Sequence, residues 1–418
     1  MRHASGARTD PRDNAEAASR RGENAFGRAG CIDGFVPRAI AAGDTACVTP
    51  QVREQILADN AAADARRGPI ATPNPEPIGP QGVGRLGVAF DDWARANRVA
   101  NASMIALLGD QVARTYDWGR WNADTIAPVA SLSKAITAAC VMALIDQRRD
   151  IFNEGTTIAQ AMPAFASSLG PVATVAVNSI RVEHLLRHQS GLEFDPLQRE
   201  ADFTVFAAIP NADEAMAREA LIRPVTGIAR RYFYNNVNYA ILGLMIRTIT
   251  GEAYGSYCQR TVLLPRGARN ARIGSGITSL GAFGGWEISA REFANFYLNP
   301  LTYAVLQQPD RSSSWRFMTT SPAGFTVVDG CEGCNYGLGV LQRPVNQPRL
   351  GPTTSYNMWH FGHWGRSSLT SPAEFGALFV RWTTNNYALV VNYDRAVSDA
   401  ARGALITNLF NAANTADP

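Results

Sequence analysis

The letters SLSK, from Ser131 to Lys134, form an SxxK pattern at the start of a helix predicted over residues 131–148. Side chains three residues apart share one face of a helix, so this hydroxyl and this amine can meet. The unpaired backbone N–H groups of a helix N-terminus can also stabilise an oxyanion. A serine hydroxyl attacks a carbonyl when a base accepts its proton, and a lysine of lowered pKa can be that base. The alternative is a serine that only caps the helix.

Lys134 is the single lysine among the 39 basic residues of the chain, and the other 38 are arginines. Arginine replaces lysine wherever a positive charge is sufficient, but it is not deprotonated in proteins. The one retained lysine therefore indicates a role that needs a titratable amine. The alternative is chance survival.

Tyr234 and Asn236 form a YxN pattern directly before the apolar stretch YAILGLMI. A phenol held near an ammonium group loses its proton more readily and can act as a general base. The Asn236 amide can hydrogen-bond the lysine and a substrate carbonyl. The chain has twelve tyrosines, so YxN alone carries little weight, and we assign the neighbouring Tyr232 and Tyr239 to packing.

Two histidines, His184 and His188, lie four residues apart on a predicted helix, a spacing that can bind a metal ion. The sequence offers no third ligand beside them, so we predict no metal site and no cofactor. The net charge of +3 is small beside 39 basic and 36 acidic residues, which gives no reason to expect a nucleic-acid partner. No run of about 18 apolar residues occurs, so no membrane span is predicted. The expected partner is a small-molecule or peptide substrate, and the sequence makes no prediction of oligomeric state.

The elements that must position these residues form one large domain with appendages. We predict a disordered arm over 1–30, a Cys-bracketed module over 31–67, a Pro/Gly linker over 68–83 and the main domain over 84–418. In the main domain, MIALLGDQVARTYDWG indicates two strands joined by a turn, and helical patterns follow, notably around His184, around Met216 and over 240–249. The later stretches TVVDG, NYGLGVLQR, EFGALFVRW and NYALVVNYD indicate strands, and a helix over 398–412 closes the chain. This order predicts an α+β fold, a sheet flanked by helices with a helical subdomain.

The six cysteines fall into three pairs. Two pairs flank or lie in Gly-containing loops and suit disulfides in an exported protein, with a zinc site as the rival for the second pair; they are Cys31 with Cys47, and Cys331 with Cys334. Cys140 and Cys258 lie in apolar, helical stretches, so we predict buried free thiols there. The first residues, MRHASGARTD, lack the apolar stretch of a signal peptide. From the placement of the cysteines we nevertheless expect a secreted or extracytoplasmic protein, whose signal peptide is not present in this sequence.

Residues 84–418 resemble the serine β-lactamase and penicillin-binding-protein superfamily, in particular class C β-lactamases and family VIII esterases. The similarity lies in the order and spacing of the SLSK helix after a strand pair and of the stretches LLRHQSGL, YNNVNYAILGLMI, GGWEISAREFANFYL, NYGLGV and FGHWG. The last stretch occupies the place of the family's third motif, Lys-Thr-Gly or His-x-Gly. The resemblance implies a β-lactamase/transpeptidase-like fold, with an antiparallel sheet flanked by helices.

The resemblance also implies roles for individual residues. Ser131 would be the acylated nucleophile, with Lys134 and Tyr234 sharing the proton transfers. His363 and Gly365 would lie on the strand that borders the site. The oxyanion hole would be formed by the backbone N–H groups of Ser131 and Arg366. His360 with Gly362 also matches His-x-Gly, and we prefer His363 because its FGHxG context is closer to the family pattern.

The third motif departs from Lys-Thr-Gly, whose cation and hydroxyl bind the carboxylate of a β-lactam in many relatives. A neutral His363 and a bulky Trp364 offer less charge and less room, although Arg366 could restore part of the charge. We therefore expect an esterase, or an amidase or peptidase, acting on small acyl substrates. The alternatives are a D-Ala-D-Ala carboxypeptidase or penicillin-binding-like protein, a β-lactamase, and a catalytically inactive surface or binding protein on the same scaffold.

Overall fold

The computed structural model describes residues 82–109, 111–198, 209–225, 232–298, 335–345, 355–365, 372–382, 384–415 and 417, with short stretches before residue 54. The chain divides into two compact units. The first comprises Met1–Glu76 with Pro300–Ala304, and the second comprises Pro77–Asn299 with Val305–Pro418.

The first unit contains two short antiparallel ladders and a disulfide. β1 pairs with β2, and β3 pairs with β4; their bounds are Arg21–Glu23, Ala29–Cys31, Val36–Pro37 and Cys47–Val48. The disulfide joins Cys31 to Cys47 with 5.6 Å between the Cα atoms, as the sequence predicted. The β1–β2 ladder falls at the end of the segment expected to be disordered. The predicted domain boundaries stay predictions.

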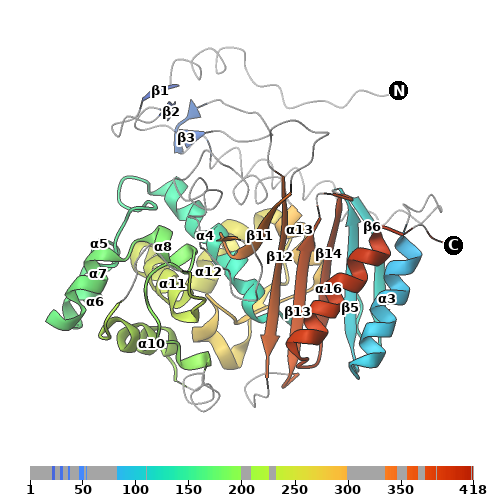
Figure 1. Ribbon diagram of the computed structural model, residues 1–418. Coiled ribbons are helices and arrows are strands. Elements are labelled where there is room, and N and C mark those ends of the chain that lie inside the picture. The colour runs from blue at the N-terminus through green and yellow to red at the C-terminus, as the bar shows by residue number, and fades with distance from the viewer. Residues whose placement is uncertain are drawn as a thin grey trace. The chain divides into compact units, whose positions relative to one another are not determined.

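The second unit is built on a seven-stranded antiparallel sheet (Figure 1). Its strands in spatial order are β10 (Asn335–Gly337), β11 (Val340–Val345), β12 (Ser355–Trp364), β13 (Phe375–Arg381), β14 (Tyr387–Tyr393), β5 (Ala102–Leu108) and β6 (Gln111–Trp118). The last strand, β14, pairs with β5, so the two ends of the domain meet in the middle of the sheet. β5, β13 and β14 are buried almost throughout, which requires a layer on each face. The predicted strands EFGALFVRW and NYALVVNYD and the predicted strand pair around Gly109 are confirmed. NYGLGVLQR forms the hairpin of β10 and β11 instead of one strand, and TVVDG lies outside the described residues.

Helices cover both faces of this sheet. On one face α3 (Val83–Ala96) and α16 (Asp399–Ala413) share a core with alternate residues of the strands (Figure 1). On the other face lies α13 (Ala290–Leu298), whose Phe293 and Tyr297 rings contact Phe379 of β13. The two layers hold the strands that border the site, and the predicted closing helix is confirmed.

The remaining helices gather beside the β11–β12 side of the sheet (Figure 1). They are α4 (Ser133–Gln147), α5 (Ile158–Ala161), α6 (Pro163–Ser168), α7 (Thr174–Ser179), α8 (Val182–Leu186), α10 (Ala212–Leu221), α11 (Asn236–Thr250) and α12 (Tyr254–Cys258), with short helices η1 (Ala130–Leu132), η2 (Pro171–Ala173), η3 (Pro196–Gln198), η4 (Gln259–Leu263), η5 (Leu264–Arg266) and η6 (Ser275–Leu280). A three-stranded sheet, β7 (Ala127–Pro128), β9 (Trp286–Ile288) and β8 (Arg272–Ile273), borders them. α4 is buried on nearly every side, because its small residues let neighbours approach closely. The predicted helical subdomain is therefore present.

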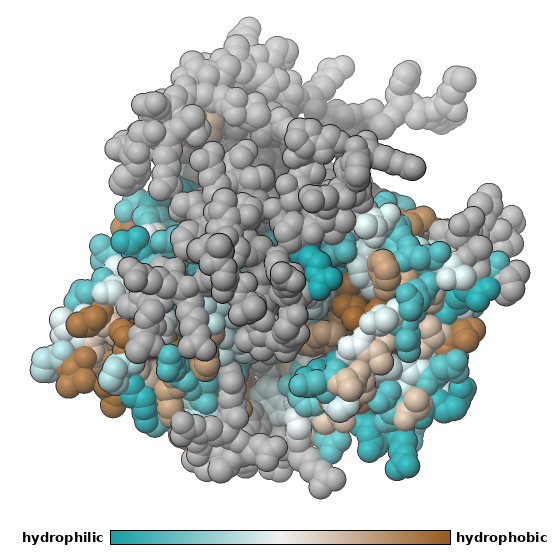
Figure 2. Space-filling view, viewed as in Figure 1, coloured by the Kyte–Doolittle hydropathy of each residue, from teal (hydrophilic) through white to brown (hydrophobic). Residues whose placement is uncertain are grey.

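The described surface mixes polar and apolar side chains. Figure 2 shows hydrophilic and hydrophobic residues interspersed on the viewed face, as the near balance of acidic and basic residues leads one to expect. Within the described residues, the helices are too short or too polar to span a bilayer.

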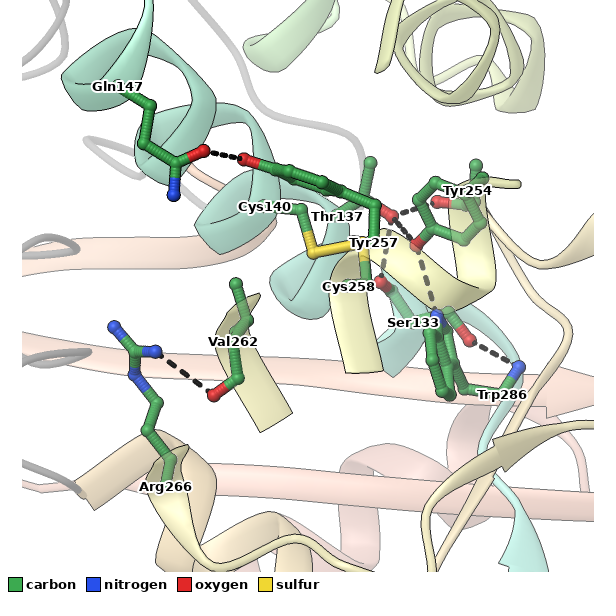
Figure 3. The surroundings of a disulfide bond; sticks show 11 residues. Ser133, Thr137, Cys140, Gln147, Tyr254, Tyr257, Cys258, Val262, Arg266 and Trp286 are labelled. Carbon is green, nitrogen blue, oxygen red and sulfur yellow. Dashed lines mark hydrogen bonds between the residues drawn. A yellow bond between two sulfur atoms is a disulfide. The ribbon is translucent and has the colours of Figure 1, made fainter. Parts of the chain in front are cut away.

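A second disulfide joins Cys140 of α4 to Cys258 at the end of α12, with 5.5 Å between the Cα atoms (Figure 3). The prediction of two buried free thiols was therefore wrong. Residues 118 positions apart are brought together only by the packing of α4 against α12, which no local pattern reveals. Cys331 and Cys334, the other predicted disulfide, lie outside the described residues.

Thiol titration tests both disulfides. Of the six cysteines, four are paired in the structure, so denatured protein prepared without reductant should titrate at most two thiols. The same protein after reduction should titrate all six. Peptide mapping should then recover the Cys140 and Cys258 peptides as one linked species, and alkylation of both residues before reduction would contradict the pairing.

Candidate active site

Ser131 lies in the turn η1, directly before α4. The preceding Ala130 has a φ of 44°, in the left-handed region that non-glycine residues seldom adopt. The turn is held from both sides: Val129 N–H donates to the Trp286 carbonyl at 3.1 Å, and the Trp286 N–H donates to Ser133 Oγ at 3.1 Å. Strained backbone that is fixed by its surroundings is typical of functional sites. The sequence predicted one helix from Ser131, whereas the α-helix itself begins at Ser133.

Three predicted residues meet at the Ser131 hydroxyl. Tyr234 OH donates a hydrogen bond to Ser131 Oγ at 2.8 Å, and Lys134 Nζ lies 3.1 Å from the same oxygen. The lysine comes from the first turn of α4, and the tyrosine comes from the segment that leads into α11. Two groups able to accept a proton are therefore in contact with one hydroxyl.

Lys134 is fully buried, and its amine is surrounded by oxygen acceptors. Nζ donates to Asn236 Oδ1 and to the Phe283 carbonyl, each at 2.8 Å. It also lies 4.9 Å from the centre of the Tyr234 ring. Burial lowers the pKa of Lys134 to about 7, and the carboxylate of Asp195 partly opposes this shift. Near neutral pH this amine can therefore both hold and release a proton.

Asp195 fixes the orientation of Asn236. Its Oδ2 accepts hydrogen bonds from the backbone N–H of Asn236 at 2.7 Å and from the side-chain Nδ2 at 3.1 Å. Because the NH₂ group is bound to Asp195, the amide oxygen of Asn236 faces Lys134. The predicted contact between Asn236 and the lysine is thus present, and its orientation comes from a carboxylate that is itself buried.

Asp195 and the Phe283 carbonyl were missed by the sequence analysis. Asp195 follows the stretch LLRHQSGL by three residues, and its position in a loop after a helix was an available signal. The Phe283 acceptor is a backbone oxygen, so its residue type carries no signal at all. Both reach Lys134 only through the tertiary packing around α4.

The pH dependence of hydrolysis tests this arrangement. Lys134 accepts a proton only in its neutral form, so kcat/KM is expected to rise with pH through about 7. Because the Asp195 carboxylate raises the pKa of Lys134, Asp195→Asn should move this acidic limb to lower pH. Asp213→Asn, which alters a carboxylate paired with Arg247 on other helices, is the matched control. An acidic limb that stays in place in Asp195→Asn would contradict the coupling.

In the structure, His360 and not the preferred His363 is the third-motif histidine that lies on the Ser131 side of β12. Along β12, Trp359 and Phe361 pack on the α3–α16 side, and His363 is exposed near Arg402 and Asp399 of α16. His363 therefore points away from Ser131, because alternate residues of a strand face opposite sides. The preference for His363 was wrong in placement: His360, on the opposite face, is the histidine that lies beside Tyr234, with 6.1 Å between ring centres.

Gly362 completes this register. A Cβ atom added there would lie 2.1 Å from the Val129 carbonyl oxygen, so β12 passes directly against the turn that carries Ser131. Any side chain at this position would push the strand away from Ser131. Gly365, in contrast, is exposed with open space around it, and Arg366 lies outside the described residues.

His360 is held as a neutral imidazole. Its Nδ1 lies 2.7 Å from the Phe361 carbonyl oxygen and therefore carries the proton. Its Nε2 then accepts a hydrogen bond from Tyr336 OH at 3.1 Å. Burial, with the nearby Lys134 charge, lowers the pKa of His360 to about 3. The position that is a cation in Lys-Thr-Gly relatives is thus uncharged here.

His184 of α8 and His188, which follows this helix, each accept a backbone hydrogen bond. His184 Nδ1 accepts the Arg181 backbone N–H at 3.2 Å, and His188 Nδ1 accepts the Asn235 backbone N–H at 3.2 Å. Among the residues that the structure describes, no group of three or more His, Cys, Asp or Glu side chains could hold a metal ion. The zinc alternative for Cys331 and Cys334 lies outside those residues.

Comparison with known proteins places the chain in one family. The family model described as Beta-lactamase matches residues 80–414, which is most of the chain. A curated protein of Escherichia coli (strain K12), named "Putative D-alanyl-D-alanine carboxypeptidase", is 27% identical over 113 residues. That match covers 26% of this chain and 25% of the relative's own length.

Solved structures with the same fold include proteins of different activity. A penicillin-binding protein homologue from Pyrococcus abyssi, described as octameric, has 19% identity and a TM-score of 0.58, covering 80% of this chain and 78% of its own. A D-stereospecific amidohydrolase from Streptomyces sp. has 18% identity and a TM-score of 0.58, covering 78% and 98%. A class C β-lactamase in complex with cefoxitin has 15% identity and a TM-score of 0.56, covering 79% and 98%. At such identities the likeness shows the fold, and the fold does not choose the substrate.

Proposed function

The chain belongs to the β-lactamase family, and from this premise we propose that it is a serine hydrolase working through an acyl-enzyme on Ser131. One observation carries the proposal: Ser131 Oγ is in hydrogen-bond contact with both Tyr234 OH and Lys134 Nζ. A hydroxyl with two candidate proton acceptors, at the N-terminal end of a helix, is the arrangement that nucleophilic acyl transfer requires.

The chemistry follows from these contacts. The Ser131 proton passes to the Tyr234–Lys134 pair as Oγ forms a bond to the substrate carbonyl carbon. The oxyanion is held by the Ser131 backbone N–H and by a second N–H from the adjacent edge of β12. The carbonyl re-forms as the bond to the leaving group breaks, and the leaving oxygen or nitrogen takes up the proton. Water then attacks the acyl-enzyme, with the same pair accepting its proton and returning one to Ser131 Oγ.

For the substrate we propose a small, uncharged ester or amide. The described residue at the head of the third motif is His360, which is neutral and has both ring nitrogens engaged within the protein. A substrate carboxylate would find no cation at this position. Esters and amides without a carboxylate beside the reacting carbonyl need no cation at this position.

D-Ala-D-Ala carboxypeptidase activity is the second candidate. The similarity to the Escherichia coli relative favours it, although that match spans about a quarter of the relative. Such a peptide ends in a carboxylate, and Arg366, four residues after Gly362 and outside the described residues, is the residue that we propose to bind it. β-Lactamase activity also needs a cation that binds the carboxylate of the substrate, so we place it beside this second candidate.

A substrate panel separates the candidates. Purified protein is incubated with p-nitrophenyl acetate and butyrate, an uncharged amino acid amide, a D-Ala-D-Ala peptide and nitrocefin, and intact mass reports any acyl adduct. Turnover of the esters or the amide with an adduct on Ser131 supports the proposal. Cleavage of only the D-Ala-D-Ala peptide would indicate a carboxypeptidase, and cleavage of only nitrocefin would indicate a β-lactamase. The absence of an adduct with every compound would favour an inactive binding protein.

We also propose an extracytoplasmic location. Disulfides persist in oxidising compartments, and the described residues contain two of them. The Cys140–Cys258 disulfide joins α12 to α4, the helix that also carries Lys134. Near this disulfide, Thr137 of α4 contacts Tyr254 OH at 2.6 Å, and Tyr254 OH accepts a hydrogen bond from the Trp286 indole (Figure 3). Oxidising conditions would thus help to fix the helix that carries Lys134.

A further inference from the structure

His188 is a buried residue that the proposed chemistry does not use. It follows α8, is 1% exposed, and has a φ of 57° in the left-handed region. The sequence analysis considered it only as half of a metal-binding pair with His184. In the structure it lies against Tyr234, with 4.5 Å between the two ring centres.

Hydrogen bonds from His188 reach the backbone on both sides of Tyr234. The His188 carbonyl oxygen accepts from the Phe233 N–H at 2.8 Å, and its Nδ1 accepts from the Asn235 N–H at 3.2 Å. Asn238, in the first turn of α11, places its Nδ2 3.0 Å from the same Nδ1. One residue therefore holds the backbone N–H groups of both sequence neighbours of the tyrosine.

Aromatic rings surround the imidazole. Besides Tyr234, three tyrosine rings have their centres within 4.6 to 5.9 Å of it; they are Tyr336, Tyr239 and Tyr232. Packing this dense leaves the imidazole one orientation, and it restricts Tyr234 to the side that faces Ser131. The phenol then reaches Ser131 Oγ at 2.8 Å.

The protonation state follows from the same contacts. Nδ1 accepts a backbone N–H, so the proton of the neutral ring lies on Nε2. This Nε2 is buried and has no hydrogen-bond partner among the described residues. Burial, together with the charge of Lys134, holds the pKa of His188 well below its usual value. A buried N–H donor without a partner lowers the stability of the fold. An apolar ring at this position would avoid this cost, which indicates that the Nδ1 acceptor has a role.

We propose that His188 is a positioning residue for Tyr234, and that its Nδ1 acceptor fixes the Asn235 peptide so that the Tyr234 phenol meets Ser131 Oγ. The inference rests on the proposed function, in which Tyr234 takes part in proton transfer. It adds a residue that touches no substrate and acts through the tyrosine. A displaced phenol should slow the chemical step and leave substrate binding nearly unchanged.

Paired substitutions separate the acceptor from the packing. His188→Asn places an amide oxygen near the position of Nδ1, and asparagine tolerates a positive φ. His188→Leu fills similar space without an acceptor, and His188→Gln carries its polar atoms farther out, near the position of Nε2. His184→Leu is the matched control, because it removes the same kind of bond, to the Arg181 N–H, from the helix that directly precedes His188.

The assay measures kcat and KM for a p-nitrophenyl ester that the wild type hydrolyses, with the melting temperature of each variant. We expect kcat to fall about 100-fold in His188→Leu and His188→Gln, because small displacements of a reacting group have effects of this size. KM should stay within about threefold, His188→Asn should regain most of kcat, and His184→Leu should match the wild type.

Two results would overturn the inference. One is wild-type kcat in His188→Gln or His188→Leu; the other is a folded His188→Asn that is as slow as His188→Gln. If His188→Leu does not fold, the Asn and Gln variants decide between the outcomes. A wild type without Ser131-dependent turnover would instead refute the proposed function, so the two failures are distinguishable.

Discussion

Replacement of Ser131 by alanine is expected to lower kcat for a short-chain p-nitrophenyl ester by at least about 10⁴-fold, as loss of the nucleophile does in serine hydrolases. Both Tyr234 and Lys134 contact the Oγ atom, so its removal takes away the hydroxyl whose proton they are proposed to accept. The side chain makes its contacts within the site, and the substitution should leave the fold intact. Stopped assays with intact mass spectrometry measure both turnover and adduct.

Ser133→Ala is the matched control for this prediction. Ser133 lies two residues further along, is fully buried, and bonds the Trp286 N–H instead of the catalytic groups. Its loss should lower the melting temperature more than it lowers kcat, and the mass adduct should remain on Ser131. Turnover retained by Ser131→Ala, or an adduct that persists in it, would refute the assignment of the nucleophile.

Lys134→Arg is expected to lose as much activity as Lys134→Ala, about 10³-fold or more in kcat. The amine sits among three oxygen acceptors at 2.8 to 3.1 Å in a fully buried site. A guanidinium keeps the positive charge, but it is larger and does not release its proton. A substitution that is conservative on the surface therefore removes the titratable group that the site requires.

Lys134→Met separates catalysis from folding in this test. Methionine keeps much of the volume of the buried stem without a polar head, so this variant should melt near the wild type and still be inactive. Circular dichroism and thermal melts of the Arg, Ala and Met variants identify any that fail to fold. Near wild-type activity in the arginine variant would mean that Lys134 acts only as a charge.

Much of the fold was predictable because it depends on local composition. The strand pair around Gly109 joins two short stretches through a Gly-Asp turn, and the helix after Ser131 and the closing helix are continuous stretches without proline. The spacing of Ser131 and Lys134 determined their contact, because residues three apart on a helix share a face. Tyr234 was found through its order relative to that motif, which is also a property of the sequence.

The third motif shows where such reasoning stops. HFGHWG contains two consecutive His-x-Gly patterns, and a strand places alternate residues on opposite faces. Which histidine faces Ser131 therefore depends on the register of β12 against β13, where His360 pairs with Phe379 and His363 with Gly376. Sheet packing sets that register, and neither the histidines nor their immediate neighbours reveal it.

The sequence by itself determined the fold class and predicted that Ser131, Lys134 and Tyr234 act together, because these rest on the order of the elements and of the motifs along the chain. The tertiary structure alone decided the pairing of Cys140 with Cys258, the acceptors around Lys134 and the place of His188 beside Tyr234. Each of these joins residues from different elements, and several use backbone atoms that every residue possesses. The chemistry of these groups depends on their burial and on the short distances between them, which arise only when α4, α8 and α11 have packed together.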